Sequence, residues 1–151
     1  MPNFDREFID ASVERLKQID LDAPPQWGEM TAAQMMGHNN MLIIYSLGKL
    51  PQLPSMSGWA TRNIVAPLIL NGIIKMPKNL KAKAKEGVPA PPPPPPGNID
   101  LLTNALEMFF EGVESGELEP PPHPAFGDLG LRGWSKLHCV HLDHHLRQFG
   151  V

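Results

Sequence analysis

Apolar residues recur at helical spacing along much of the chain, and this pattern predicts four main helices. Side chains three and four residues apart share one face of a helix. Stripes of this kind run over residues 4–21, 31–47, 99–113 and 131–149. Neither strand-like alternation nor an internal repeat is visible in the sequence. We therefore predict an all-α fold, a four-helix bundle with long crossover loops.

The second of these stripes places a histidine where packing alone favours leucine. Thr31 and Gln34 form a capping-box pattern, in which each side chain satisfies a backbone N–H at the start of a helix. Counting in helical steps from there puts His38 on the inner face. The inner stripe is predicted to be Met35, His38, Leu42 and Tyr45.

A less regular apolar segment follows the second predicted helix. Residues 57–75 are mostly apolar, and Pro67 removes a backbone donor, so we predict an extra kinked helical segment or two short helices. The stretch 64–74 is interrupted by Asn71 and Gly72 and is shorter than the roughly 20 residues of a membrane span. We interpret it as a buried helix.

Residues 75–97 are rich in lysine and proline. The proline run 91–96 permits only polyproline II as a regular structure, which favours a solvated connector between helices. Two alternatives are a docking arm for a proline-reading protein and a lysine patch that binds an anionic substrate. The lysines are Lys75, Lys78, Lys81, Lys83 and Lys85.

Composition narrows the class of protein. A length of 151 residues suits a single domain over residues 1–151. The 13 basic and 16 acidic residues give a net charge of −3, which offers no attraction for nucleic acid or an anionic membrane, so a small-molecule substrate is the expected partner. With Cys139 as the only cysteine and an acidic N-terminus unlike a signal peptide, we expect a cytoplasmic location. The oligomeric state stays open, with a homodimer as one option.

Polar residues occupy the stripe that should face the core in the last predicted helix. Its members follow steps of 4, 3, 4 and 3 residues, so they share one face. Burying an unpaired imidazole costs about 1–3 kcal/mol, so these histidines need partners if the stripe packs inward. A metal ion would satisfy several of them at once. The stripe consists of Trp134, His138, His141, His145 and Gln148.

His141 and His145 have the spacing that directs two imidazoles toward one point beside a helix. His38 is the candidate third ligand, which would leave one coordination position for water or substrate, as in catalytic sites. Imidazole ligands suit zinc, nickel, copper or iron. His138 competes with His38 for the third place, and His144 lies about 100° round the helix from His145, at the rim. The alternatives are a solvated histidine-rich surface and an ordinary core histidine.

The end of the chain resembles the HxxHHxxQ signature of the DinB-like (DinB/YfiT) metal-binding superfamily, in the stretch His141-Leu-Asp-His-His145-Leu-Arg-Gln148-Phe-Gly150. It is most similar to an uncharacterised branch, family 1569 of the domains of unknown function. Three other stretches share this resemblance, which therefore covers nearly the whole chain. They are Trp27-Gly-Glu-Met-Thr-Ala-Ala-Gln-Met-Met-Gly-His38, His123-Pro-Ala-Phe-Gly127 and Trp134.

This resemblance implies a four-helix bundle with one divalent metal ion, zinc or nickel, at the end of its cavity. His38, His141 and His145 match the ligand positions, and Gln148 would orient a ligand or a metal-bound water. The segment 75–97 departs from the family pattern and cannot be mapped onto it. The candidates for the cavity or its rim are His138, His144, Trp134 and Tyr45.

Relatives in the wider superfamily include metal-dependent transferases and an isomerase that use low-molecular-weight thiols. The resemblance therefore implies a metal-dependent thiol S-transferase or detoxifying enzyme, with a low-molecular-weight thiol as co-substrate. A metal-dependent hydrolase is one alternative, but it needs a general base, and Asp143 points away while Asp128 and Glu29 lie in predicted loops. Another alternative is a non-catalytic metal- or small-molecule-binding module. Cys139 lies off the histidine face and is interpreted as a packing residue.

Overall fold

The computed structural model describes residues 3–78 and 92–151, and each regular element in those ranges is a helix. The all-α prediction is therefore confirmed. Four of the helices are long, and a short π-helical turn, η1, leads into the five-residue α3. The elements are α1 (Arg6–Lys17), α2 (Ala32–Ser46), η1 (Thr61–Val65), α3 (Ala66–Leu70), α4 (Ile99–Ser115) and α5 (Gly130–Gln148).

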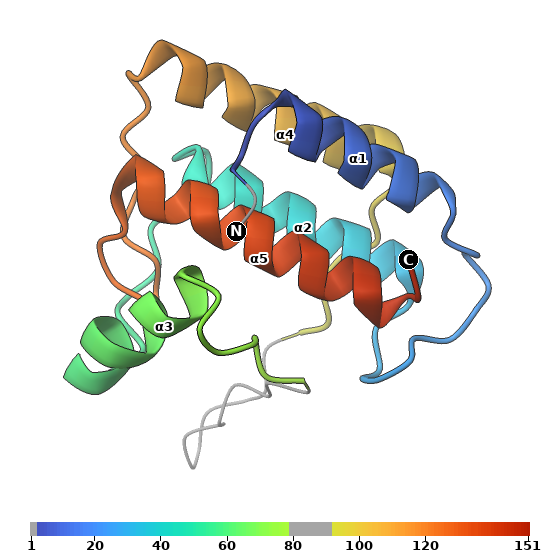
Figure 1. Ribbon diagram of the computed structural model, residues 1–151, viewed down its shortest axis with the longest axis horizontal. Helices are drawn as coiled ribbons and strands as arrows, with labels where there is room; N and C mark the ends of the chain where they lie inside the picture. Colours follow the sequence, from blue (N-terminus) through green and yellow to red (C-terminus); the bar gives the residue numbers. More distant parts are fainter. Residues whose placement is uncertain (1–2, 79–91) are drawn as a thin grey trace.

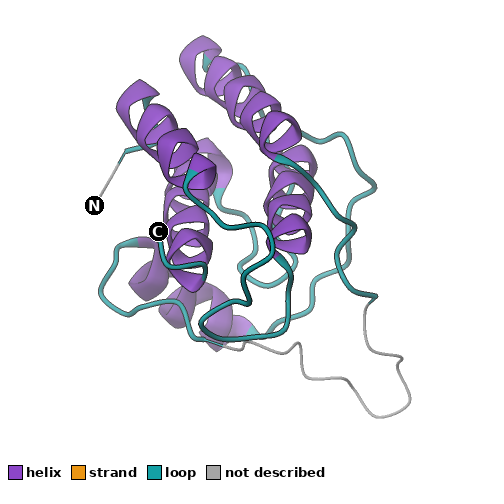
Figure 2. Ribbon diagram, turned by 90° about the vertical axis from the view of Figure 1, so that its right-hand side faces the viewer, coloured by secondary structure: helices purple, strands orange, loops and turns teal. Residues whose placement is uncertain are grey.

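The four long helices form a bundle in which each packs against two others. Both α4 and α5 contact α1 and α2, and α3 adds to the bundle by packing on α5. Figure 1 shows α1 beside α4 and α2 beside α5, and Figure 2 shows the same helices turned by 90°. Apolar side chains without solvent exposure fill the centre, and their burial is the main source of stability. They include Leu16, Met35, Leu106, Phe109, Trp134 and Leu146.

Local capping chemistry sets the ends of α2 and α4. The predicted capping box is present: Thr31 Oγ1 accepts from the Gln34 N–H at 3.1 Å, and Gln34 Oε1 accepts from the Thr31 N–H at 3.0 Å. Asn98 caps the start of α4. Gly116 ends α4 with a φ of 68°, a left-handed conformation that glycine adopts without strain.

The first helix is shorter than the predicted range 4–21. The side chain of Asp5 caps its first turn, and the helix ends at Lys17. Beyond that point the Asp20 carboxylate accepts a hydrogen bond from the Asp22 N–H at 3.0 Å. A side chain that bonds the nearby backbone in this way favours a turn over continued helix, which explains the earlier end.

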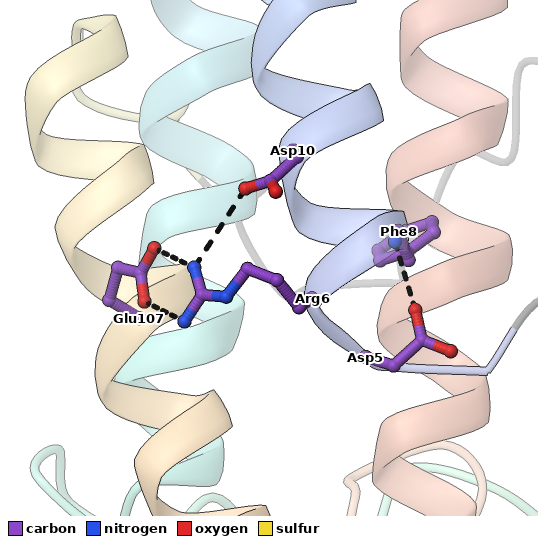
Figure 3. A network of polar contacts seen from close by, with 5 residues as sticks. All are labelled: Asp5, Arg6, Phe8, Asp10 and Glu107. Carbon is purple, nitrogen blue, oxygen red and sulfur yellow. Dashed lines mark hydrogen bonds and ion pairs between the residues drawn. The ribbon is translucent and has the colours of Figure 1, made fainter.

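An ion pair links α1 to α4 at the surface. The Arg6 guanidinium makes two hydrogen bonds to the Glu107 carboxylate, of 2.5 and 2.8 Å, and lies 3.9 Å from Asp10 (Figure 3). These contacts are charge-assisted and hold the pKa of Glu107 below its usual value. Because both side chains remain solvent-exposed, the pair orients the two helices more than it stabilises them.

The segment after α2 is kinked, as predicted, but it is not a buried helix. Pro67 lies in the first turn of α3, where a missing backbone N–H is tolerated. Only one face of the segment is buried, through Ala66, Ile69 and Leu70, and α3 is the part that packs on α5. Ile73, at 69% exposure, lies beyond the end of α3 and is open to solvent. The exposed apolar residues of this stretch also include Ile64 and Ile74.

The lysine- and proline-rich connector is anchored to α2 at its far end. Lys81, Lys83, Lys85 and Pro91 lie outside the described residues. Most of the prolines from 92 to 96 are exposed, as expected for a connector. Its last residue, however, donates a hydrogen bond from Gly97 N–H to the Ala33 carbonyl at 2.8 Å. No described helix is long and apolar enough to cross a membrane.

Candidate metal centre

The structure brings His38, His141 and His145 together at the contact between α2 and α5. The Nε2 atom of His141 lies 3.0 Å from His38 Nε2 and 3.2 Å from His145 Nε2. One ligand atom from each of the three rings falls within 4.8 Å of the others. Helical spacing aligns the pair on α5, and the packing of α2 against α5 supplies the third imidazole.

Two of the three nitrogen separations match those in the ligand shell of a small divalent ion, and the third is at most 4.8 Å. Zinc binds histidine nitrogen at about 2.0–2.1 Å, so two nitrogens in a tetrahedral site lie about 3.3 Å apart. The observed separations of 3.0 and 3.2 Å are close to that value. His141 and His145 are 9% and 7% exposed, and His38 is only partly buried, so the cluster lies at the edge of the core.

Gln148 fixes the orientation of one imidazole in the cluster. Its side-chain N–H donates to the Trp27 carbonyl at 2.7 Å, so its amide oxygen faces His145 and lies 2.7 Å from Nδ1. The Nδ1 atom of His145 therefore carries the hydrogen, and its Nε2 presents a lone pair to the other two rings. This arrangement is the one in which an outer amide orients a metal-binding histidine.

Hydrogen bonds alone cannot satisfy both short contacts of His141. A neutral imidazole nitrogen is either a donor or an acceptor. If His141 Nε2 carries a hydrogen, it can point that hydrogen at His38 or at His145, but not at both. If it carries none, its lone pair faces the lone pair of His145. A divalent cation would accept all three lone pairs at once. A metal ion therefore satisfies these three nitrogens better than hydrogen bonds among the imidazoles do.

Burial keeps the three imidazoles neutral, which is the form that binds a metal. Desolvation lowers the pKa of His38. It also lowers the pKa of His145 to about 4, although the hydrogen bond to Gln148 acts in the opposite direction. The pKa of His141 is held well below its ordinary value, first by burial and then by the neighbouring histidines. At neutral pH no imidazolium charge therefore opposes a cation.

His144 lies beside the cluster, within a small group of residues at its border. Its ring centroid is 5.2 Å from that of His145 and 5.4 Å from that of Trp27. The ammonium of Lys78 lies over the indole of Trp27, 4.3 Å from the ring centroid. Burial lowers the pKa of His144, the positive charges of Arg147 and Lys78 lower it further, and the carboxylate of Asp143 acts in the opposite direction.

His138 is a core histidine and does not compete with His38. Its Nε2 lies 2.9 Å from Ser46 Oγ, whose own hydrogen is donated to the Ile43 carbonyl at 2.7 Å. His138 Nε2 is therefore the donor in this pair. The ring also packs on Phe109 at 4.6 Å between centroids, and burial lowers its pKa to about 3. The sequence predicts a cavity or rim position for His138; the structure buries its side chain to 2% exposure on a turn of α5 that faces the apolar core.

Tyr45 and Trp134 hold a loop and are not seen to line an open cavity. The Tyr45 hydroxyl donates to the Pro122 carbonyl at 3.0 Å, and the Trp134 Nε1–H donates to the Pro121 carbonyl at 2.9 Å. Both side chains are buried. The adjoining loop is closed by paired backbone hydrogen bonds between residues 123 and 127. The sequence predicts both rings at the cavity or its rim, whereas their burial puts them in the core.

Two of the three candidate carboxylates, those of Asp143 and Asp128, are engaged by other partners, and Glu29 is exposed in the loop before α2. Asp143 pairs with Arg15 at 2.9 Å and also with Arg147, so it is oriented away from the histidine face, as predicted. Asp128 accepts from Gly130 N–H at the start of α5, many residues before the site.

The sequence did not single out the Ser46 hydroxyl or the Trp27 carbonyl, because neither pairing follows from spacing along one helix.

These features define a class of protein, an all-helical bundle in which two helices bring three histidines together. The chain belongs to the family described as protein of unknown function (DUF1569), whose model matches residues 3–150. This match confirms the branch to which the sequence was most similar. No curated protein and no solved structure shows significant similarity to the chain.

Proposed function

We propose that the protein binds one divalent metal ion through His38, His141 and His145. The observation that carries the proposal is the double short contact of His141 Nε2, which hydrogen bonds cannot satisfy at both ends. Three neutral imidazoles suit zinc or nickel, and three protein ligands leave a coordination position free for a small molecule. Membership of the wider DinB-like superfamily is part of this proposal.

We further propose that the site acts as a metal-dependent thiol S-transferase or detoxifying enzyme, with a low-molecular-weight thiol as co-substrate. When bound, such an ion lowers the pKa of a thiol at its open position. The chain's own residues contribute orientation, because Gln148 fixes the ring of His145. The engagement of Asp143 with two arginines favours thiol chemistry over hydrolysis, since a hydrolase needs a nearby general base.

A cytoplasmic location and a homodimer stay predictions.

Metal analysis of untagged protein by mass spectrometry tests the first proposal. We expect one equivalent of zinc or nickel per chain, and its loss when His141 and His145 are both replaced by alanine. His144→Ala is the matched control, because it removes a neighbouring imidazole of α5 outside the cluster and should leave metal content unchanged. Wild-type protein that binds no added zinc, nickel or cobalt would overturn the proposal.

A further inference from the structure

A cation, the ammonium of Lys78, is connected to the histidine cluster by a series of three contacts that pass through Trp27 and Gln148. Lys78 Nζ lies 4.3 Å from the ring centroid of Trp27. The backbone of Trp27 accepts from Gln148, whose amide oxygen is 2.7 Å from His145 Nδ1. The ring of Trp27 also faces His144. The lysine is therefore coupled to the same support that orients a metal ligand.

The ammonium of Lys78 is positioned by the Trp27 ring, and no carboxylate of residues 3–78 or 92–151 forms an ion pair with it. An indole face attracts a cation while taking up only one side of it, which leaves N–H donors free to bind an anion. Two arginines near this end of α5 do form ion pairs within residues 3–78 and 92–151. Arg15 and Arg147 both bind Asp143. Lys78 belongs to none of those pairs and is solvent-exposed.

We propose that Lys78, held over Trp27, determines specificity by binding an anionic group of the molecule whose thiol occupies the metal site. The inference rests on the proposed function and adds the substrate class: a small thiol that also carries a carboxylate or a similar anion. The thiol sulfur would face the three histidines while its anionic end meets the ammonium. Trp27 is a positioning residue, because it holds the lysine and does not itself pair with the anion.

Two small thiols that differ in charge test this assignment on cobalt-loaded protein. Mercaptopropionate and mercaptoethanol both offer a thiol, but only the first carries a carboxylate. Binding is followed by the sulfur-to-cobalt charge-transfer absorption, which needs no enzymatic turnover. The ratio of the two dissociation constants is compared between wild type and Lys78→Gln, so that intrinsic differences between the thiols cancel. We expect the preference for mercaptopropionate to fall about tenfold in Lys78→Gln.

Two further variants separate the site from general charge effects. Lys75→Gln removes another exposed lysine of the same segment and should keep the wild-type ratio. Trp27→Leu removes the ring but keeps the backbone carbonyl that accepts from Gln148, so it should lower the ratio without loss of cobalt.

The outcomes distinguish this inference from the proposed function. An unchanged ratio in Lys78→Gln, with both thiols bound, would overturn the role of Lys78 and leave the metal and thiol chemistry standing. Cobalt-loaded wild-type protein that binds neither thiol would overturn the thiol chemistry and this inference together. Protein that takes up no cobalt would overturn the metal site and everything that rests on it.

Discussion

At the scale of single residues, the behaviour of each histidine follows from its hydrogen-bond partner. Four of the six histidines lie in α5 and the other two pack against it, yet they have different roles. His138 donates to a serine and is a core residue, whereas His145 donates to an amide and turns its lone pair toward two other rings. An imidazole nitrogen that faces an acceptor can donate its hydrogen, whereas one that faces other lone pairs needs a donor or a cation between them.

Gln148 provides a residue-scale prediction. Replacing it with leucine removes the acceptor for His145 Nδ1–H and the donor to Trp27, so the ligand ring loses its fixed orientation. We expect metal affinity to fall about 10–100-fold. Competition with a chromophoric chelator measures the change. Gln18→Leu, at an exposed position beyond α1, is the control, and equal affinities in the two variants would refute a positioning role for Gln148.

At the scale of elements, the connector and α2 approach each other closely just before His38. A Cβ atom added at Gly37 would lie 1.8 Å from the Pro95 carbonyl oxygen, and one added at Gly97 would lie 2.6 Å from the Gly37 backbone nitrogen. Both positions therefore need glycine for space rather than for conformation. The anchored end of the connector consequently limits how α2 presents His38 to α5.

Gly37→Ala should damage both stability and metal binding. The methyl group meets backbone on the connector, which cannot rotate away as a side chain could, so α2 or the connector must shift. We expect about 1–3 kcal/mol lower free energy of unfolding and weaker metal binding. Urea unfolding and chelator competition measure the two effects. Gly58→Ala, where an added Cβ meets nothing within 4 Å, should change neither.

At the scale of the whole molecule, stability of the metal-free protein should depend on pH through buried histidine. His138 has an ordinary pKa of 6.5 when unfolded and about 3 when folded, because burial disfavours its charged form. The unfolded chain therefore binds more protons below pH 6.5, and stability falls as the pH falls toward 3. This histidine alone accounts for about 2 kcal/mol of lost stability at pH 5.

Denaturant unfolding at pH 7 and pH 5, in the presence of a chelator, measures this dependence. His138→Gln keeps a donor for Ser46 but cannot titrate, so its stability should change less between the two pH values than that of the wild type. An identical change in both proteins would show that His138 does not carry the effect.

The sequence by itself determined the features that depend on neighbours along one helix. Periodicity and capping residues located the four long helices, since a helix repeats every few residues and its first turn needs local acceptors. Spacing alone also put His141 and His145 on one face. The predicted range of the first helix is too long, because the turn that the Asp20 side chain favours is a weak sequence signal.

Only the tertiary structure decided what each face meets. The inward stripe of α5 is one continuous row in the sequence, but it passes Ser46 at His138 and reaches His38 one turn later, at His141. The anchoring of Gly97 on α2 and the position of Lys78 over Trp27 are likewise contacts between segments far apart in the chain. The exposure of Ile73 also depends on how these segments pack. Helical spacing fixes the direction of a side chain around its own axis, whereas its partner depends on how separate helices and loops pack.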